Sequence, residues 1–473
     1  MNLATVVRVN ARNHPQKTAI VCGQQTYTYA EAWSAIEGIA ATLIESGVGS
    51  GDRVGLSMRD HPLHLLAHYA IARIGAIIVP IDHRWTVPEK AAAASTFATH
   101  LVLTDGADIE DVATHELTEG CTRGNVDCLP AMSADDCTLL ISLSSGTTGK
   151  PKGALVTHRN LYERFVSQWV AIGFDAQEVF GLVTPLCFGA GRSFGMCMLA
   201  AGATVKLAPP PLAPDELLTA LADPVVTATF LPPTLLRRLL PLAQPDSRLL
   251  DNLRFLIVSG EPLYAAEAAD IRRVVSDRLV GYYASSEGGG ISVLSSADFA
   301  EHAATVGTPT FRTEVDIVDA DDASLPSGEV GRLRYRGPGV ATRFVNQDGR
   351  EQEGQDGGWF YPGDLAERLP SGHLALRGRD KDVVVRGGIN VYPAEIEAVL
   401  QQHPDVSECA VVGRTDAARG EIIAAYVVCS ASDEELEAHC RDRLAPYKIP
   451  TSFNRLDTLP KASSGKIDKG ALR

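Results

Sequence analysis

The segment 144–153, SSGTTGKPKG, holds three glycines, four hydroxyl side chains and two lysines in ten residues. It follows the apolar run 139–143 (LLISL), so we expect it to leave the end of a strand. Backbone N–H groups in a glycine-rich turn can converge on an anion, and serine and threonine hydroxyls add further donors. The composition of this loop therefore favours the binding of phosphate.

A Walker phosphate-binding loop requires the pattern GxxxxGK[ST], which this segment does not meet. Gly149 and Lys150 are followed by Pro151 where the hydroxyl residue should stand, and Gly146 lies too close to Gly149. The alternative for an isolated SGTTG is a flexible surface turn, because glycine and small polar residues are typical of linkers. The loop by itself leaves both interpretations open.

Three further segments carry acidic, aromatic and basic side chains that could act on a nucleotide: 283–287 (YASSE), 358–364 (GWFYPGD) with 378–382 (GRDKD), and 460–469 (PKASSGKIDK). Taken alone, each has an ordinary interpretation. Glu287 would be a solvated acid, Asp364 a turn residue after a Pro-Gly pair, and Lys466 a surface charge. Only their combination with the loop points to chemistry.

Together with the loop, these segments resemble the adenylate-forming superfamily of acyl-CoA synthetases, nonribosomal-peptide adenylation domains and beetle luciferases. Four other segments match its signatures: 27–31 (YTYAE), 47–53 (GVGSGDR), 75–80 (GAIIVP) and 387–397 (GGINVYPAEIE). The resemblance covers nearly the whole chain. Any one motif is weak, but by their order and spacing the chain is identified as a member of this family.

The resemblance implies a reaction in two halves. A carboxylate attacks the α-phosphate of ATP to give acyl-AMP and pyrophosphate, and a thiol then displaces AMP. Because the first half brings one anion to another, it needs neutralisation of charge and orientation more than acid–base catalysis. The implied cofactors are ATP, Mg²⁺ and coenzyme A, with the phosphopantetheine of a carrier protein as the alternative thiol.

The family's triphosphate site would be built by the loop and by 283–287. Glu287 resembles the ligand for Mg²⁺, a hard cation that prefers oxygen. Ser286 resembles the hydroxyl residue near the α-phosphate. In the loop, Lys152 would add charge beside the residues that wrap the β- and γ-phosphates, which are Ser145, Gly146, Thr147, Thr148, Gly149 and Lys150.

The rest of the nucleotide site would come from the later motifs. Asp364 resembles the carboxylate that accepts hydrogen bonds from both ribose hydroxyls, a task for a two-oxygen acceptor, and Arg379 resembles its partner. Tyr283 resembles the aromatic residue that stacks on adenine. Lys466 resembles the lysine whose ammonium bridges the substrate carboxylate and an α-phosphate oxygen.

Two positions are implied to serve the second half-reaction. Lys381 resembles the hinge residue about which the C-terminal domain turns between the two half-reactions, and the neighbouring Gly378 leaves the backbone free to do so. Gly387 and Gly388 would line the tunnel for the pantetheine thiol. The chain stops at Arg473, so we expect no carrier domain behind this motif.

The acid-binding pocket is implied to lie in 184–195, 259–263 and 281–285, where the sequence departs from the family pattern. Many acyl-CoA synthetases carry a histidine where this chain has Phe188, and amino-acid adenylation domains carry an aspartate at Gly189. An α-amino acid is therefore not expected. Tyr282 and Ala284 replace frequent glycines and fill space, which predicts a short or flat acid. The pocket residues are Phe188, Gly189, Arg192, Ser259, Gly281, Tyr282 and Ala284.

Arg192 is the unusual polar residue of this pocket segment, 189–193 (GAGRS). One hypothesis is that it pairs with a second anionic or polar group of the substrate, because a buried guanidinium needs a partner. The alternative is that it points away and forms a salt bridge with a surface acid. The sequence leaves both open.

The elements that must position these residues are typical of an α/β protein. Runs rich in β-branched residues occur at 53–58, 76–80, 100–104, 204–207 and 255–259, and 29–46 and 63–74 carry apolar residues at helical spacing. This alternation predicts α/β layers with parallel sheets, whose ligands sit at loops leaving the carboxyl ends of strands.

The character of the sequence changes beyond about residue 305. Strands expected at 315–318 and 331–335 form a β-rich subdomain, and a shorter unit with helices at 393–403 and 433–444 and strands at 410–412 and 422–428 follows. We place the boundary at Lys381. Residues 1–380 are predicted to form a large N-terminal domain of layered sheets and helices, and 381–473 a small mobile α+β C-terminal domain.

Composition excludes several classes of function. A formal charge of −15 argues against a nucleic-acid binder, which needs a basic face. No apolar stretch reaches the roughly 18 uncharged residues of a membrane span, and the N-terminus does not resemble a signal peptide. Nine cysteines without a CxxC pair are typical of reduced thiols, so we expect a cytoplasmic enzyme.

The leading hypothesis is ATP-dependent activation of a small or aromatic acid and its transfer to coenzyme A. The alternative is a stand-alone enzyme that loads the acid onto a freestanding carrier protein. A non-catalytic relative would be expected to lack Lys466, Glu287 or Asp364, and all three are present. An oxygenating luciferase shares the motifs. We expect a monomer or a homodimer.

Overall fold

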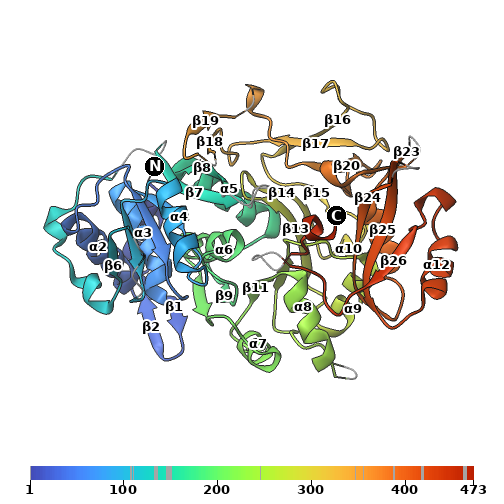
Figure 1. The fold of residues 1–473 in the computed structure, drawn as a ribbon. Helices are drawn as coiled ribbons and strands as arrows, with labels where there is room; N and C mark the ends of the chain where they lie inside the picture. Colours follow the sequence, from blue (N-terminus) through green and yellow to red (C-terminus); the bar gives the residue numbers. More distant parts are fainter. Residues whose placement is uncertain are drawn as a thin grey trace.

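The computed structural model describes residues 2–106, 109, 111–132, 137–144, 152–244, 247–346, 348–354, 356–386, 389–416, 420–461 and 466–473. Two large sheets with helices between and around them form most of the molecule (Figure 1). A β-rich layer lies along the top of this view, and the C-terminal region lies at the right. The predicted α/β fold class is confirmed.

The first large sheet has nine strands in the order β15-β14-β13-β12-β11-β9-β10-β1-β2. Its central strands β13, β12, β11, β9, β10 and β1 run parallel, and antiparallel strands close both edges. The bounds are β1 Thr18–Cys22, β2 Gln25–Thr28, β9 Val179–Leu182, β10 Thr204–Leu207, β11 Ala228–Leu231, β12 Phe255–Val258, β13 Leu279–Ser285, β14 Gly289–Leu294 and β15 Thr308–Pro309.

The second large sheet has eight strands in the order β19-β18-β8-β7-β4-β3-β5-β6. Strands β7 and β8 form an antiparallel pair in which Ser144 opposes Lys152, and the glycine-rich segment connects them. The bounds are β3 Arg53–Ser57, β4 Ile77–Pro80, β5 Leu101–Thr104, β6 Thr114–Glu116, β7 Thr138–Ser144, β8 Lys152–Thr157, β18 Arg343–Val345 and β19 Glu351–Glu353.

The helices of the N-terminal region begin and end at strong local signals. Helix α5 starts at a capping box, in which Thr157 Oγ1 accepts from the N–H of Asn160 at 3.0 Å, and it ends at Gly173 with a φ of 92°. Helix α3 is buried along its whole length. The helices are α1 Ala4–Asn13, α2 Tyr29–Glu45, α3 Pro62–Ile74, α4 Val87–Thr96, α5 His158–Ile172, α6 Gly189–Ala201, α7 Pro214–Leu221, α8 Pro233–Leu239, α9 Ala265–Val274 and α10 Phe299–His302.

Two smaller sheets complete the fold. The β-rich layer is a four-stranded antiparallel sheet of β16 Glu314–Val318, β17 Gly331–Arg336, β20 Asp364–Arg368 and β21 Leu374–Arg379. The C-terminal sheet packs around its own hydrophobic cluster, together with helices α11 Pro393–Leu400 and α12 Asp433–Arg441. Its strands are β22 Val384–Arg386, β23 Ile389–Val391, β24 Val406–Asp416, β25 Gly420–Cys429 and β26 Ser452–Arg455.

The expected strands and helices occur within a few residues of their predicted positions. The domain boundary at Lys381 stays a prediction. Lys381 lies in a short 3₁₀ turn, Asp380–Asp382, between β21 and β22. Within the described part of the chain, no helix is long and apolar enough to cross a membrane.

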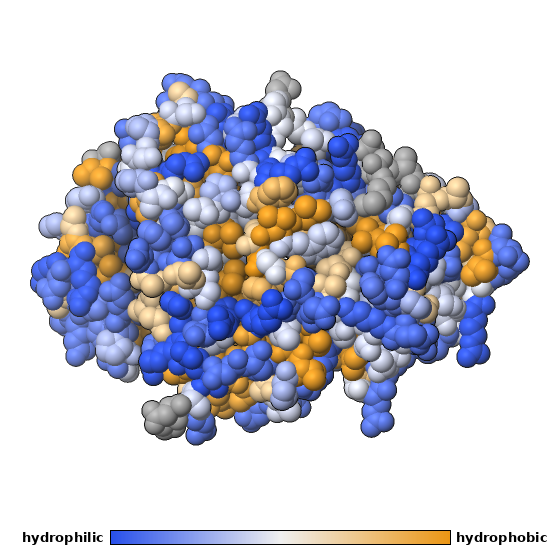
Figure 2. Space-filling model, turned by 180° about the vertical axis from the view of Figure 1, so that it is seen from behind, coloured by the Kyte–Doolittle hydropathy of each residue, from blue (hydrophilic) through white to orange (hydrophobic). Residues whose placement is uncertain are grey.

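The reverse face of the molecule carries hydrophobic residues in separate patches between hydrophilic ones (Figure 2). All nine cysteines are free. Burial raises the pKa of the Cys187 thiol to about 12, which leaves it protonated and unreactive at neutral pH.

Candidate active site

Two residues predicted to bind the ribose, and one predicted to stack on adenine, lie together on three strands. Asp364 opens β20 and pairs in register with Arg379, the last residue of β21. The Nε of Arg379 lies 2.8 Å from Oδ1 of Asp364, and the hydroxyl of Tyr283 on β13 donates to Oδ2. Three residues that are up to 96 positions apart in the sequence are therefore held around one carboxylate.

Asp364 is buried, with 7% of its surface exposed, whereas the Arg379 side chain is half exposed. Burial raises the pKa of Asp364, and Arg379, Tyr283 and Lys466 act in the opposite direction. Among the described residues these groups use both carboxylate oxygens, so ribose hydroxyls would share an acceptor that is already oriented. Arg379 is itself fixed by a 2.6 Å bond from Nη1 to the carbonyl of Pro362.

Lys466 comes from the last described segment of the chain and lies within the electrostatic reach of this corner. Burial and Arg379 lower the pKa of its ammonium, while Glu261 and Asp364 raise it. The residue retains exposed surface, so it stands at the edge of the site with water on one side. Lys466 is thus within electrostatic reach of Asp364 and Arg379, although it comes from a separate sequence motif.

Ser286 and Glu287 form the turn between β13 and β14. Ser285 Oγ accepts from the N–H groups of Glu287 and Gly288 at 3.2 and 3.1 Å, and it is hydrogen-bonded to the buried hydroxyl of Tyr335. Ser286 is exposed and Glu287 is half-buried. The backbone of the turn is therefore fixed, and among the described residues no group forms a hydrogen bond or ion pair with the side chains of Ser286 and Glu287.

The residues present fit a Mg²⁺ ion. No hydrogen bond or ion pair to the Glu287 carboxylate occurs within the described ranges, which leaves its oxygens free for a hard cation. No group of three or more His, Cys, Asp and Glu that could hold a metal occurs there either. A single carboxylate such as that of Glu287 suits Mg²⁺, which proteins often bind through one or two carboxylates plus substrate phosphates.

Sequence reasoning missed Arg164, a buried residue of α5. Its guanidinium donates to the carbonyls of Ser286, Glu287 and Gly339 at 3.3, 2.5 and 2.8 Å. A signal was present in the three consecutive glycines 288–290, because such a run indicates close approach of other groups to the backbone.

Two predicted pocket residues, Phe188 and Gly189, lie at the N-terminus of α6. Phe188 is the N-cap residue, and its ring lies under the Arg84 guanidinium, 5.2 Å from Cζ of the arginine to the ring centroid. Arg84 is held in turn by Asp82, at 2.6 Å. Gly189 is exposed, and a Cβ added there would meet nothing within 4 Å. There is open space beside the helix start.

Arg192 is buried in α6, with 4% of its surface exposed. Its Nη1 donates to the carbonyls of Cys187 and Leu186 at 3.1 and 3.5 Å. The alternative in which Arg192 points outward to a surface acid is therefore wrong. Burial lowers its pKa to about 10, and the nearby Arg164 acts in the same direction. In the part of the chain that the structure describes, no carboxylate lies within 4 Å of this guanidinium.

The other predicted pocket residues lie along β12 and β13. Tyr282 is buried and meets the Phe194 ring edge-on at 5.9 Å, and Phe194 stacks on Phe230 at 5.4 Å. Ala284 packs against the same core. Ser259, which directly follows β12, and Gly281 are both half-buried. An aromatic wall thus lies behind this part of the site.

Several predicted residues lie outside the described residues. These are Gly387 and Gly388 of the tunnel and the phosphate-loop residues Ser145, Gly146, Thr147, Thr148, Gly149 and Lys150. Their proposed roles stay predictions. Lys381, the predicted hinge residue, is described and exposed, and its carbonyl accepts from Nη2 of Arg473 at 3.4 Å.

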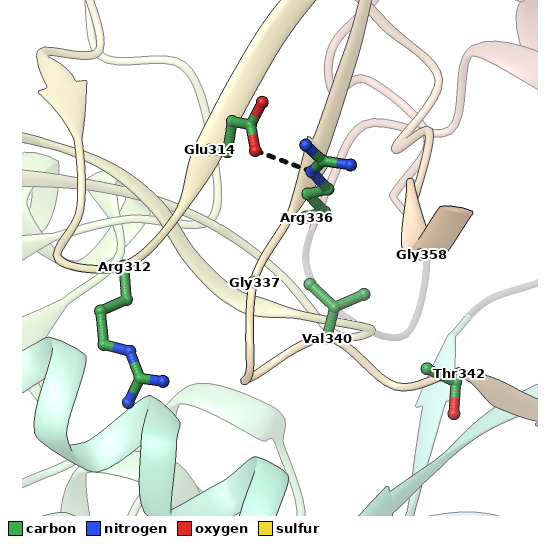
Figure 3. Close-up of a pocket in the computed structure, with 7 residues that line it drawn as sticks. All are labelled: Arg312, Glu314, Arg336, Gly337, Val340, Thr342 and Gly358. Atoms are coloured by element: carbon green, nitrogen blue, oxygen red, sulfur yellow. Dashed lines mark hydrogen bonds and ion pairs between the residues drawn. The ribbon is translucent and has the colours of Figure 1, made fainter. Parts of the chain in front are cut away.

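A cavity of about 350 Å³ opens beside the β-rich layer (Figure 3). Its lining includes Arg312 and Arg336, which pair with Glu163 and Glu314, each at 2.7 Å. Asp364, Arg379 and Lys466 do not line it. Both arginines already have a carboxylate partner, so the lining residues that the structure describes offer no unpaired cation to an anionic ligand, and we do not assign the cavity to the candidate site.

Comparison with protein families gives a clear assignment. The model of the AMP-binding enzyme family matches residues 7–345, and that of the AMP-binding enzyme C-terminal domain matches residues 395–466. The chain belongs to the AMP-binding enzyme family. The resemblance suggested by the motifs is thereby confirmed.

This AMP-binding enzyme is similar over nearly its full length to named CoA ligases. It is 33% identical to feruloyl-CoA synthase of Amycolatopsis sp, over 98% of this chain and 96% of that one. It is 27% identical to 2-succinylbenzoate–CoA ligase of Bacillus licheniformis, over 97% of both chains. It is 29% identical to indoleacetate–CoA ligase of Aromatoleum aromaticum, over 100% of this chain and 98% of that one.

Solved structures agree with this assignment. The o-succinylbenzoate CoA synthetase of Bacillus subtilis in complex with its acyl-adenylate intermediate has a TM-score of 0.89 at 27% identity, with 99% of this AMP-binding enzyme and 97% of that chain covered. The same enzyme in complex with ATP and a magnesium ion also has a TM-score of 0.89, at 28% identity and 98% coverage of both chains.

Proposed function

We propose that this AMP-binding enzyme converts a small or aromatic carboxylic acid into its acyl-CoA. In the first step a carboxylate oxygen of the acid attacks the α-phosphorus of ATP, the bond to pyrophosphate breaks, and acyl-AMP forms. In the second step the thiol sulfur of coenzyme A attacks the acyl carbonyl carbon, the bond to AMP breaks, and the thiol proton is released. Family membership and full-length similarity to CoA ligases support this reaction.

The observation that carries the proposal is the ion pair of Asp364 with Arg379, which has Lys466 within its electrostatic reach. The lysine lies 87 positions beyond Arg379 in the chain, yet it stands in the field of both groups. An ammonium so placed would neutralise the carboxylate and the α-phosphate as they approach, which is the main requirement of the first step. Asp364 would hold the ribose and so align the α-phosphate with the acid.

Glu287 and Ser286 are proposed to serve the phosphates. Glu287 would hold Mg²⁺, which when bound offsets the charge of the triphosphate. Ser286 would donate its hydroxyl near the α-phosphate, and the loop 145–150 would wrap the β- and γ-phosphates. Tyr283 is proposed to stack on adenine while its hydroxyl keeps its bond to Asp364.

The acid is proposed to be aromatic or otherwise flat. Relatives are named for feruloyl, 2-succinylbenzoyl and indoleacetyl CoA esters. The aromatic wall of Phe194, Phe230 and Tyr282 suits such a ring, since aromatic pairs add to simple burial of area. Arg192 is proposed to meet a second polar or anionic group of the acid, because the described residues give its buried charge only carbonyl partners.

The thiol acceptor is proposed to be coenzyme A, reached through a tunnel at Gly387 and Gly388 after the unit beyond Lys381 turns. A freestanding carrier protein is the alternative acceptor. We also propose that the reaction takes place in the cytoplasm, where ATP and coenzyme A are both present, and that the enzyme is a monomer or a homodimer.

The test is a pyrophosphate-release screen. Purified enzyme with ATP and Mg²⁺ is given benzoic, cinnamic and arylacetic acids, with and without a second carboxylate, and octanoate as a long-chain control. Each acid is assayed with and without coenzyme A, and the products are identified by mass spectrometry. We expect acyl-AMP without coenzyme A and acyl-CoA with it for at least one aromatic acid.

The outcomes separate the parts of the proposal. Pyrophosphate and acyl-AMP without any CoA thioester would point to a carrier protein as the acceptor. A preference for octanoate would overturn the aromatic acid. No pyrophosphate with any acid of the panel would contradict the proposed reaction.

A further inference from the structure

The turn that carries Glu287 is held by a side chain from a helix more than 100 residues earlier in the chain. Arg164 of α5 donates through Nη2 to the carbonyl of Glu287 at 2.5 Å and through Nη1 to that of Ser286 at 3.3 Å. The N–H of Ala341 also donates to the Glu287 carbonyl, at 3.0 Å. The backbone on either side of the Glu287 side chain is therefore fixed by a charged donor.

The same face of α5 also holds the loop that follows β17. Arg164 donates through Nε to the carbonyl of Gly339 at 2.8 Å. One turn earlier, Asn160 Nδ2 donates to the carbonyls of Pro338 and Val340, at 2.8 and 3.2 Å. Positions four apart lie on one helix face, so α5 ties the Glu287 turn and the 338–340 loop together.

Glycines in the Glu287 turn and in the 338–340 loop leave space for the side chains of Arg164 and of two tyrosines. A Cβ on Gly289, whose φ is 77°, would lie 2.8 Å from Cγ of Arg164, and one on Gly339 would lie 3.0 Å from the same atom. A Cβ on Gly288 would meet the Tyr335 hydroxyl at 2.3 Å, and one on Gly290 would meet the Tyr282 hydroxyl at 2.2 Å. A larger residue in the run 288–290 would displace the Arg164 side chain, one of the two tyrosines or the turn itself, which explains the glycines.

The charge of Arg164 is costly where it lies. The residue is 6% exposed, and among the described residues no carboxylate lies within 4 Å of it. Burial lowers its pKa, and Glu287 acts in the opposite direction. A buried charge without an ionic partner is a poor way to stabilise a fold, since an apolar residue of similar volume often does as well or better. The geometry thus indicates a functional reason for the guanidinium.

We propose that Arg164 is a positioning residue that sets the Ser286–Glu287 turn so that the Glu287 carboxylate faces Mg²⁺ bound to ATP. It acts through backbone carbonyls and does not touch the metal. This inference rests on the proposed function, in which Glu287 holds the metal. Partners that orient a metal ligand typically change metal affinity or activity by about 10- to 100-fold when they are removed.

The experiment compares Arg164→Gln and Arg164→Lys with Arg312→Gln. The control breaks the exposed pair of Arg312 with Glu163, which also ties α5 to a neighbouring loop but does not touch the Glu287 turn. ATP binding is measured by calorimetry with Mg²⁺ and with EDTA, and thermal unfolding is followed for every variant. The gain in ATP affinity that Mg²⁺ provides is the quantity compared.

We expect Arg164→Gln to lose about 10- to 100-fold of that gain, with a change below about threefold in EDTA. Arg164→Lys should fall between it and the wild type, because lysine keeps the charge but cannot reach all three carbonyls. Arg312→Gln should keep the full gain. If Arg164→Gln does not fold, Arg164→Lys decides the question, with an expected loss of about threefold or more.

Two results would overturn the inference. One is a folded Arg164 variant that keeps the wild-type gain from Mg²⁺, and the other is an equal loss of ATP affinity with Mg²⁺ and with EDTA, as a purely structural role predicts. If the ATP affinity of the wild-type protein is the same with Mg²⁺ and with EDTA, the metal role of Glu287 is refuted, and the inference with it.

Discussion

Two groups of charged residues in this enzyme differ in their partners. At the proposed ribose site, Asp364 has Arg379 at 2.8 Å, and the partly exposed Lys466 lies within electrostatic reach. Inside the molecule, Arg164 and Arg192 are both buried, and in the described part of the chain their guanidinium groups meet only backbone carbonyls. The first group is neutralised by the protein itself.

The difference suggests a division of labour. At the proposed ribose site, the Asp364 carboxylate is already held in place by its partners. Binding of the neutral ribose would therefore cost little entropy on the side of the protein. Unpaired buried cations raise the positive potential of the interior, which favours the approach of phosphates and carboxylates. The proposed first step brings the carboxylate of the acid to a phosphate of ATP, and a positive potential would favour this approach of two anions.

The largest expected effect is at Lys466. Lys466→Ala should slow pyrophosphate release by about 10²- to 10³-fold, as the loss of one preorganised electrostatic contact does. Conversion of supplied acyl-AMP to acyl-CoA should change much less, because charge no longer has to be brought together. Stopped-flow or coupled assays of each half measure this. Equal losses in both halves would show that the role of Lys466 is not specific to adenylation.

The second prediction concerns the proposed ribose site at Asp364. Asp364→Ala removes the partner of both Arg379 and Tyr283, and it should lower kcat/KM for ATP by about 10- to 100-fold, since hydrogen bonds to a charged group contribute about 1.5–3 kcal/mol. The KM for the acid should stay within about threefold of the wild-type value. Steady-state kinetics with each substrate varied decide the outcome. A matched loss for the acid would contradict a ribose-specific role.

Arg192 tests the buried cations from the side of the acid. Arg192→Met should lower kcat/KM by about tenfold for an aromatic acid with a second carboxylate, and much less for the acid without it, because an unpaired partner loses a charge-assisted bond. Kinetics with such a pair of acids provide the measurement. An equal effect on both would indicate that the residue only braces the carbonyls of Leu186 and Cys187.

The lowered pKa of Lys466 predicts a pH dependence. Burial and Arg379 move this pKa below the usual value of 10.5, so the ammonium becomes neutral at a lower pH than that of a free lysine. The rate of adenylation should therefore fall on the alkaline side before pH 10.5. Lys466→Arg should show no such fall over the same range, whatever its absolute rate, because arginine stays protonated. A shared alkaline limb in pH profiles would assign it to another group.

The smallest effect is expected at the cavity beside the β-rich layer. Arg336→Gln breaks an exposed pair with Glu314, so the free energy of unfolding should change by about 1 kcal/mol or less. The KM for ATP should not change, because Asp364, Arg379 and Lys466 do not line this cavity. Denaturant titration and kinetics test both points. A raised KM would extend the site to this cavity.

Much of the fold could be predicted from local patterns. Strands such as β3 and β12 and helices such as α2 and α3 occur where β-branched runs and helical spacing placed them. Helix ends follow from short signals, as with the capping box of Thr157 and Asn160. These features depend on neighbours within about one turn or one strand, so a single sequence contains the information.

The candidate site was only partly accessible in this way. Glu287, Asp364 and Lys466 stand in motifs, so their types and order could be read directly. Arg164 could not, because nothing near it in the sequence marks it, and its partners lie 122 and more positions away. The glycine run 288–290 indicates only that some group approaches the backbone there, not which one. The direction of Arg192 was also undecidable, since burial of a helix position depends on what packs over it.

The sequence by itself determined the family, the class of fold and the chemical types available for the reaction, because motifs and periodicity are local properties of the chain. The tertiary structure decided which of those groups meet. It placed Tyr283 and Arg379 on one carboxylate, brought Lys466 within electrostatic reach of it, and turned Arg164 towards the backbone of Glu287. Such contacts join distant segments, and only the packing of the whole chain fixes their distances.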